Sequence, residues 1–116
     1  MKKEPKIVNI NEAEGIQLTP YDRVRRLITK GREGSEKLML GVSFMDPTNK
    51  PYSWSYSEND EVYFVVRGRL KLQWNDKEAI AEEGDAVFLP AGWKYRVRNP
   101  GVEPTMIVYV LSPPIE

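Results

Sequence analysis

Residues 51–67 read PYSWSYSENDEVYFVVR, and residues 84–99 read GDAVFLPAGWKYRVRN. Both stretches are rich in β-branched and aromatic residues, which favour strands, and both are bounded or interrupted by glycine. Gly68 follows the first stretch, and Pro90-Ala91-Gly92 interrupts the second. Because glycine permits sharp bends at strand ends, these segments predict two strand pairs that converge on one pocket, with Glu61 near its centre.

The spacing of these residues resembles the paired motifs of the cupin superfamily. In the first motif a glutamate is followed, after six residues, by a glycine, and these positions match Glu61 and Gly68. In the second motif a glycine is followed by Pro-x-Gly and then by an asparagine, and these positions match Gly84, Pro90, Gly92 and Asn99. The Trp-x-Tyr-x4-Glu segment is also loosely similar to small cupins of the ethanolamine-utilisation type. The resemblance implies an all-β fold, a single-domain cupin jelly-roll β-barrel.

The metal ligands of that family are missing, because the chain contains no histidine. Depending on the spacing allowed before Glu61, the positions of the family's His-x-His pair fall on Ser55 and Ser57 or on Trp54 and Tyr56. Tyr95 stands where the second motif has its histidine. Since a catalytic metal needs about three protein ligands, we expect no metal and no other cofactor. A metal-dependent cupin enzyme with atypical ligands, such as a Tyr95 phenolate, remains an alternative.

The overall composition limits the possible partners. Seventeen basic and seventeen acidic residues cancel, which removes the long-range field that would attract nucleic acid or an anionic membrane. No apolar run approaches the length of a membrane span, and the first residues lack the apolar core of a secretion signal. We therefore expect a cytoplasmic protein with no nucleic-acid or membrane partner.

The flanking segments predict further strands and no helix. Residues 1–35 are expected to form N-terminal edge strands, at Lys6–Ile10 and within residues 21–30, and residues 36–116 the barrel itself. Arg23, Arg25, Arg26 and Lys30 are interpreted as a solvated edge, or as a basic patch or bridge to a partner subunit. Residues 38–45 look apolar on both faces. Because such edges and faces need protection, we predict a homodimer.

Period-two alternation predicts which residues share the pocket. It places Glu61 and Tyr63 on one side of a strand, facing the lumen, and Val62 and Phe64 on the other, in an apolar layer outside it. The resemblance implies that Tyr95 faces them. Asn99, which precedes Pro100-Gly101, is interpreted as a turn residue.

The predicted lumen combines one acid with aromatic walls. Glu61, Tyr63 and Tyr95 would line it together with either Trp54 and Tyr56 or Ser55 and Ser57, which suits a small neutral or cationic organic metabolite. A carboxyl group in an apolar lumen is also suited to proton transfer. Glu61 assisted by Tyr95 would then act as an isomerase, lyase or cyclase, whereas a non-catalytic sensing or assembly module is the alternative. The residues leave open whether the protein is an enzyme.

Overall fold

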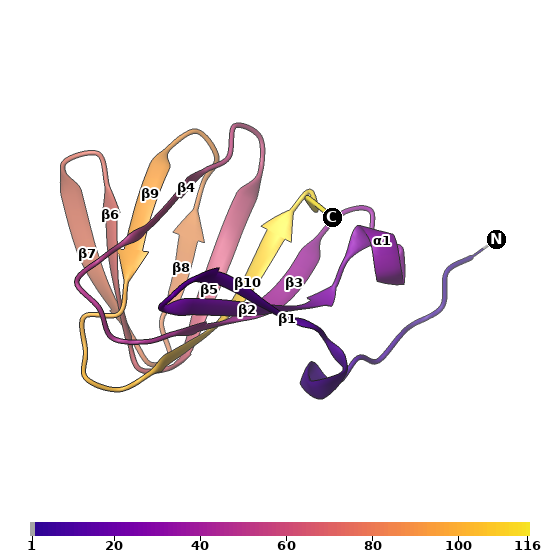
Figure 1. Cartoon of the computed structure of the whole chain (residues 1–116). Coiled ribbons are helices and arrows are strands. Elements are labelled where there is room, and N and C mark those ends of the chain that lie inside the picture. The colour runs from indigo at the N-terminus through magenta and orange to yellow at the C-terminus, as the bar shows by residue number, and fades with distance from the viewer. Residues whose placement is uncertain (1) are drawn as a thin grey trace.

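The computed structural model describes residues 2–116 as two antiparallel sheets that face each other (Figure 1). The larger sheet has the order β1-β2-β3-β10-β5-β8, and the smaller has the order β4-β9-β6-β7. The strands of the larger sheet are β1 (Gly15–Thr19), β2 (Asp22–Ile28), β3 (Met39–Met45), β10 (Thr105–Ser112), β5 (Asp60–Arg67) and β8 (Ala86–Leu89). Those of the smaller sheet are β4 (Tyr52–Ser55), β9 (Lys94–Arg98), β6 (Arg69–Trp74) and β7 (Lys77–Glu82). The prediction of an all-β jelly roll is confirmed.

Gly68 marks the point where the chain passes from the larger sheet to the smaller one. Its φ of 90° lies in the left-handed region that favours glycine. A β-carbon there would lie 2.5 Å from Oγ1 of Thr105 and 2.9 Å from its Cα. The Thr105 hydroxyl accepts a hydrogen bond from the Arg69 backbone N–H at 3.1 Å and donates one to the Arg69 carbonyl at 2.7 Å. This contact fixes the angle at which β5 and β6 diverge.

The core lies between the sheets and follows the period-two pattern. In β5, Glu61 and Tyr63 are buried, as predicted, and Val65 is buried with them. Val62 and Phe64 point away from the core, but they are 41% and 46% exposed. The prediction that they lie in an apolar layer outside the lumen is therefore wrong for the single chain. A two-sheet domain of this size has one interior, and the outer face of its larger sheet meets solvent.

The N-terminal region differs from the prediction in three ways. Lys6–Ile10 forms no strand, because Asn9 caps a 3-10 turn (η1, Ile10–Glu12). The Asn9 side chain accepts a hydrogen bond from the Asn11 N–H, and the Glu12 side chain accepts one from the Asn9 N–H. The arginine-rich segment is a strand, β2, but it lies between β1 and β3 and not at an edge. A four-residue helix, α1 (Lys30–Glu33), follows it and is capped by the Thr29 side chain.

The arginines of this region have individual partners. Arg23 pairs with Asp46 at 3.1 Å, Arg25 donates to the carbonyls of Ile10 and Ala13, and Arg26 pairs with Glu116. The interpretation as one solvated basic edge is therefore wrong, because each guanidinium is used within the chain.

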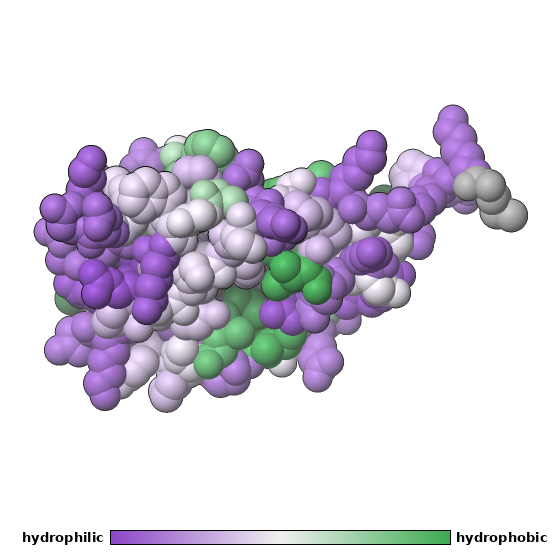
Figure 2. Space-filling model, turned by 90° about the horizontal axis from the view of Figure 1, so that it is seen from above, coloured by the Kyte–Doolittle hydropathy of each residue, from purple (hydrophilic) through white to green (hydrophobic). Residues whose placement is uncertain are grey.

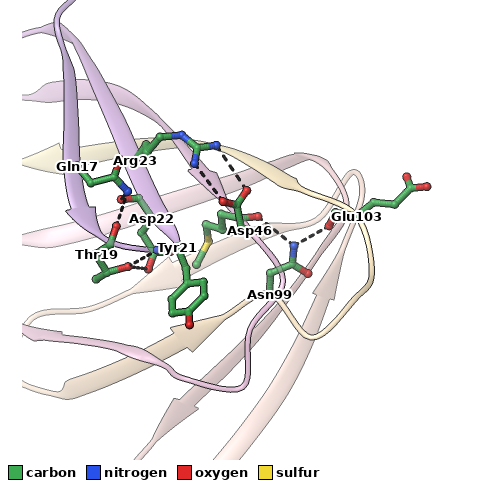
Figure 3. A network of polar contacts seen from close by, with 9 residues as sticks. Gln17, Thr19, Tyr21, Asp22, Arg23, Asp46, Asn99 and Glu103 are labelled. Atoms are coloured by element: carbon green, nitrogen blue, oxygen red, sulfur yellow. Dashed lines mark hydrogen bonds and ion pairs between the residues drawn. The ribbon is translucent and has the colours of Figure 1, made fainter.

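Asn99 is a buried turn residue, as its sequence context predicts. Its Nδ2 donates to the carbonyls of Met45 and Glu103 at 3.0 and 2.7 Å (Figure 3). Its Oδ1 accepts from the Gly101 N–H. Within the described residues, no helix has the length and apolar character needed to cross a membrane.

Candidate functional site

A cavity of about 80 Å³ lies between the two sheets. It is lined by aromatic, aliphatic and charged side chains from both sheets and from the C-terminal segment: Leu18, Asp22, Val24, Arg26, Met39, Ser43, Met45, Tyr52, Trp54, Tyr56, Glu61, Tyr63, Val97, Ile107, Tyr109, Leu111 and Ile115. Figure 2 shows hydrophobic residues gathered near the middle of the visible face, with hydrophilic residues toward both ends. Glu61, Tyr63, Trp54 and Tyr56 of the predicted site are among the lining residues.

One wall of the cavity is aromatic and comes mainly from β4. Alternation turns Tyr52, Trp54 and Tyr56 inward and leaves Ser55 and Ser57 exposed. The Trp54 ring stacks on Tyr52 and Tyr63, with centroids 5.8 and 6.0 Å apart. The structure thus places the Trp54 and Tyr56 alternative in the lumen. The alternative placement of Ser55 and Ser57 in the lumen is corrected, because both side chains are exposed and neither lines the cavity.

Glu61 is the acidic group beside this wall and is only 6% exposed. The indole Nε1–H of Trp54 donates to its Oε1 at 3.1 Å. Burial disfavours the carboxylate and raises the pKa of Glu61 to about 7, while the Trp54 hydrogen bond lowers it in part. A carboxyl group with this pKa exchanges protons readily at neutral pH.

The phenols around Glu61 remain protonated at neutral pH. Burial, with a further contribution from the Glu61 charge, raises the pKa of Tyr56 to about 12. Burial also raises the pKa of Tyr63 and, together with the Asp22 and Glu61 charges, that of Tyr52. Each hydroxyl is therefore a hydrogen-bond donor toward a ligand oxygen.

Tyr95 occupies a different place from the one predicted. It is buried, but it is not among the cavity-lining residues. Its hydroxyl donates to the Pro90 carbonyl at 2.5 Å, and its ring packs against Trp54 with centroids 5.4 Å apart. The predicted placement of Tyr95 in the lumen is corrected on this ground, whereas its role as an acid–base assistant stays a prediction. Its ring supports that of Trp54.

The structure adds a polar row that the sequence prediction missed. Arg26 of β2 pairs in register with Gly41 of β3, Gly41 with Tyr109 of β10, and Tyr109 with Tyr63 of β5. A β-carbon on Gly41 would lie 2.4 Å from the Tyr109 hydroxyl, so this phenol extends across the glycine toward Arg26. Burial raises the pKa of Tyr109, and the Arg26 guanidinium lowers it in part.

Asp22 lies on the cavity wall beyond this row. Its Oδ2 accepts a hydrogen bond from the Thr19 hydroxyl at 2.6 Å, and Thr19 also accepts from the Tyr21 N–H (Figure 3). Burial raises the pKa of Asp22, and the Thr19 hydrogen bond opposes that shift. The β1–β2 turn thus holds the Asp22 side chain in place.

The donor set does not fit the divalent metal of the family. Within residues 2–116, no three Asp, Glu, His or Cys side chains lie close enough together to hold an ion. Glu61 already accepts from an indole N–H, and the nearby Tyr56 and Tyr63 are phenols with raised pKa values. Protonated phenols and an indole are poor ligands for Zn²⁺, Mn²⁺ or Fe²⁺.

Comparison with known sequences identifies a family and several related proteins. The family model described as Cupin domain matches residues 44–111. The polyketide synthase CurC of Streptomyces cyaneus is 26% identical over 112 residues, which span 97% of this chain and 72% of CurC. The tetracenomycin polyketide synthase protein TcmJ of Streptomyces glaucescens is 26% identical over 89 residues, which span 77% of this chain and 60% of TcmJ.

Solved structures share the fold. KdgF from Halomonas sp. superposes with a TM-score of 0.79 at 14% identity, covering 95% of this chain and 94% of KdgF. The EutQ protein of Clostridium difficile has a TM-score of 0.68 at 27% identity, covering 84% of this chain and 67% of EutQ. A Salmonella typhimurium protein described as ethanolamine utilisation protein Q (EutQ) has a TM-score of 0.69 at 25% identity, covering 80% of this chain and 70% of that protein. The similarity to ethanolamine-utilisation cupins indicated by the sequence is therefore confirmed.

Proposed function

The chain belongs to the cupin superfamily, and from that premise we propose that it binds a planar organic metabolite in its lumen and transfers a proton to or from it through Glu61. The reaction class is that of an isomerase, lyase or cyclase. The observation that carries this proposal is the buried Glu61 carboxyl, whose pKa is about 7 and which lies in an aromatic cavity.

The aromatic wall of the cavity and the related proteins CurC and TcmJ support one class of ligand. Trp54, Tyr52 and Tyr63 offer stacked ring faces, which favour a flat conjugated molecule. The phenols donate hydrogen bonds to carbonyl or hydroxyl oxygens. CurC and TcmJ are named as polyketide synthase proteins, and aromatic polyketides combine these features. We propose a ligand that places a carbon–hydrogen bond adjacent to a carbonyl next to Glu61.

The proposed chemistry uses a proton donor and acceptor and no metal. The Glu61 carboxylate removes the proton from the carbon, the carbon–hydrogen electron pair moves to form an enolate, and a Tyr63 or Tyr56 hydroxyl donates a hydrogen bond to its oxygen. Return of the proton from the Glu61 carboxyl to another carbon completes an isomerisation. In a ring closure, the enolate carbon instead bonds to a second carbonyl carbon of the ligand, and the Glu61 carboxyl gives its proton to the alkoxide oxygen that forms. A general base in this position contributes typically ~10²–10⁴-fold to the rate.

Deuterium exchange tests this proposal with a defined probe. Acetophenone has a flat ring and slowly exchanging hydrogens next to its carbonyl. We expect the protein to bind acetophenone in H₂O, shown by a shift of the Trp54 indole N–H resonance, and to accelerate exchange of the methyl hydrogens in D₂O with EDTA. In Glu61→Gln, acetophenone binding should remain and exchange should fall to the uncatalysed rate.

The possible outcomes separate the candidate functions. Binding without exchange would overturn catalysis and favour the non-catalytic sensing or assembly module. Exchange that EDTA abolishes would favour a metal-dependent enzyme with atypical ligands. Failure of acetophenone to bind at millimolar concentration would overturn the aromatic ligand class.

A further inference from the structure

Arg26 is a cationic residue on the cavity wall, and the acid–base proposal gives it no role. It lies at one end of the row that continues through Gly41 and Tyr109 to Tyr63. Glu61 lies two residues before Tyr63 on β5, so the cation and the carboxyl group stand near opposite ends of this row. A ligand in the lumen can therefore present different groups to the two residues.

The hydrogen-bonding capacity of Arg26 is only partly used. Its Nη1 pairs with the Glu116 carboxylate, while its Nε–H is buried and finds no acceptor within residues 2–116. Buried donors are nearly always hydrogen-bonded in folded proteins, so an Nε–H group without an acceptor requires an explanation. A guanidinium has a fork of donors that matches a carboxylate, which accepts two parallel hydrogen bonds.

The partner that Arg26 has now belongs to the C-terminal segment at the cavity. Ile115 lines the cavity and is about half exposed. The backbone carbonyl of Glu116 accepts a hydrogen bond from the Lys30 N–H at 2.7 Å. The cavity of about 80 Å³ is smaller than pockets that enclose drug-sized ligands, roughly 300–1,000 Å³. Movement of Ile115 and Glu116 would both enlarge the cavity and free the guanidinium.

We infer that Arg26 is the anion-binding residue of the lumen and binds a carboxylate oxygen of the ligand in place of the Glu116 carboxylate. Tyr109, which reaches Arg26 across Gly41, donates a second hydrogen bond to the same anion. This inference rests on the proposed function and narrows its substrate class to planar molecules that carry an acidic oxygen at the end remote from Glu61.

A pair of probes with the same shape tests the inference. Benzoate carries the acidic oxygens, whereas benzamide is a neutral molecule of nearly equal size. We expect the wild-type protein to bind benzoate at least tenfold more tightly than benzamide, measured by titration of the Trp54 indole resonance. Arg26→Gln should remove this preference, and Arg26→Lys should retain part of it because it keeps the charge and loses the fork.

Glu116 provides a variant that leaves the cavity wall intact. Glu116→Gln should tighten benzoate binding several-fold and leave benzamide binding unchanged, because it removes the competing carboxylate. This variant keeps the inference testable even if Arg26→Gln fails to fold, which thermal unfolding would reveal. Glu103→Gln, at an exposed loop position, is the matched control.

The outcomes distinguish this inference from the function on which it rests. Equal affinity for benzoate and benzamide, or no effect of Glu116→Gln on benzoate, would overturn the anion site while leaving an aromatic lumen and Glu61 chemistry in place. If neither probe binds, both the anion site and the aromatic ligand class are overturned. Preference for benzoate without acceleration of acetophenone exchange would support the anion site and overturn catalysis.

Discussion

The Trp54 indole nitrogen donates a hydrogen bond to the Glu61 carboxylate at 3.1 Å, inside a wall that also holds the phenols of Tyr52, Tyr56 and Tyr63, whose pKa values are raised. This single hydrogen bond is too weak to offset the burial of the acid, so the pKa of Glu61 stays near 7. The arrangement keeps the group near half ionisation at neutral pH and makes the folded state sensitive to its charge.

Stability should fall as the pH rises through the range in which Glu61 ionises. The pKa of Glu61 is about 7 in the folded state, against 4.5 for an unperturbed glutamate. Between these pH values the unfolded chain releases the proton and the folded chain retains it, so the free energy of unfolding decreases by about 3 kcal/mol and levels off above pH 7. The Glu61→Gln variant lacks this pH-dependent change in the free energy of unfolding.

Urea unfolding of both proteins at pH 4.5 and pH 8 measures the effect. We expect the stability of Glu61→Gln relative to wild type to increase by about 2–3 kcal/mol between these pH values. Other carboxyl groups, including Asp22, titrate in both proteins and cancel in the difference. A difference that does not change with pH would show that Glu61 ionises normally in the fold.

Removing the indole donor should move the pKa of Glu61 in a defined direction. The Trp54 hydrogen bond favours the carboxylate, so Trp54→Phe should raise the pKa of Glu61 above 7. Titration of the side-chain carboxyl carbon by NMR measures the value, with Trp74→Phe as a control in the smaller sheet. A lower pKa in Trp54→Phe would mean that water enters the enlarged cavity and outweighs the lost donor.

Tyr95→Phe should affect stability and not proton transfer. The Tyr95 hydroxyl donates to the Pro90 carbonyl, and loss of one such hydrogen bond costs about 0.5–1.5 kcal/mol. Because the ring that supports Trp54 remains, the rate of acetophenone exchange should stay within about twofold of wild type. Tyr63→Phe is the comparison on the lumen side. A large loss of exchange in Tyr95→Phe alone would return Tyr95 to the acid–base role.

The outer face of the larger sheet leads us to propose that a second copy of the chain packs on it. Val62 and Phe88 are directly opposite each other on β5 and β8 and are 41% and 64% exposed, and Phe64 and Val66 extend the same apolar surface. Contiguous apolar surface of this kind usually marks a contact site. The balanced charge of the chain sets no long-range repulsion between two copies.

Light scattering tests the homodimer directly. We expect twice the chain mass of 13.4 kDa at micromolar concentration, and the mass of one chain for Phe88→Glu. Val62→Asp should likewise weaken association and still fold, since the side chain is exposed in the single chain. Val102→Asp, at a loop position that is 93% exposed, is the control. A wild-type protein that stays monomeric would rule out the second copy as the occupant of this face.

The register of β5 and the position of Glu61 could be predicted because alternation is local to one strand. The choice between Trp54 with Tyr56 and Ser55 with Ser57 could not, because β4 ends at Ser55 and β5 begins at Asp60, and alternation cannot be counted across the irregular segment between them. Once β4 is seen as a strand, period two also places Tyr52 inward.

Arg26 was missed for a different reason. A charged residue in a strand is usually solvated, and nothing local to residues 21–30 indicates that β2 lies between two other strands. Its neighbours in the row, Gly41 and Tyr109, come from strands remote in sequence. Sites assembled across several strands depend on pairing that a single sequence does not reveal, whereas turns such as those at Gly68 and Asn99 depend on nearby residues.

Gly41 shapes the lumen although it does not line it. Its missing β-carbon is what allows the Tyr109 phenol to lie across β3 toward Arg26. A methyl group there would displace the ring and separate the phenol from the cation, while every charged and aromatic residue stayed in the sequence. Ligand preference among related proteins can therefore diverge through substitution at a residue outside the binding surface, and comparisons limited to the lining residues would not detect the change.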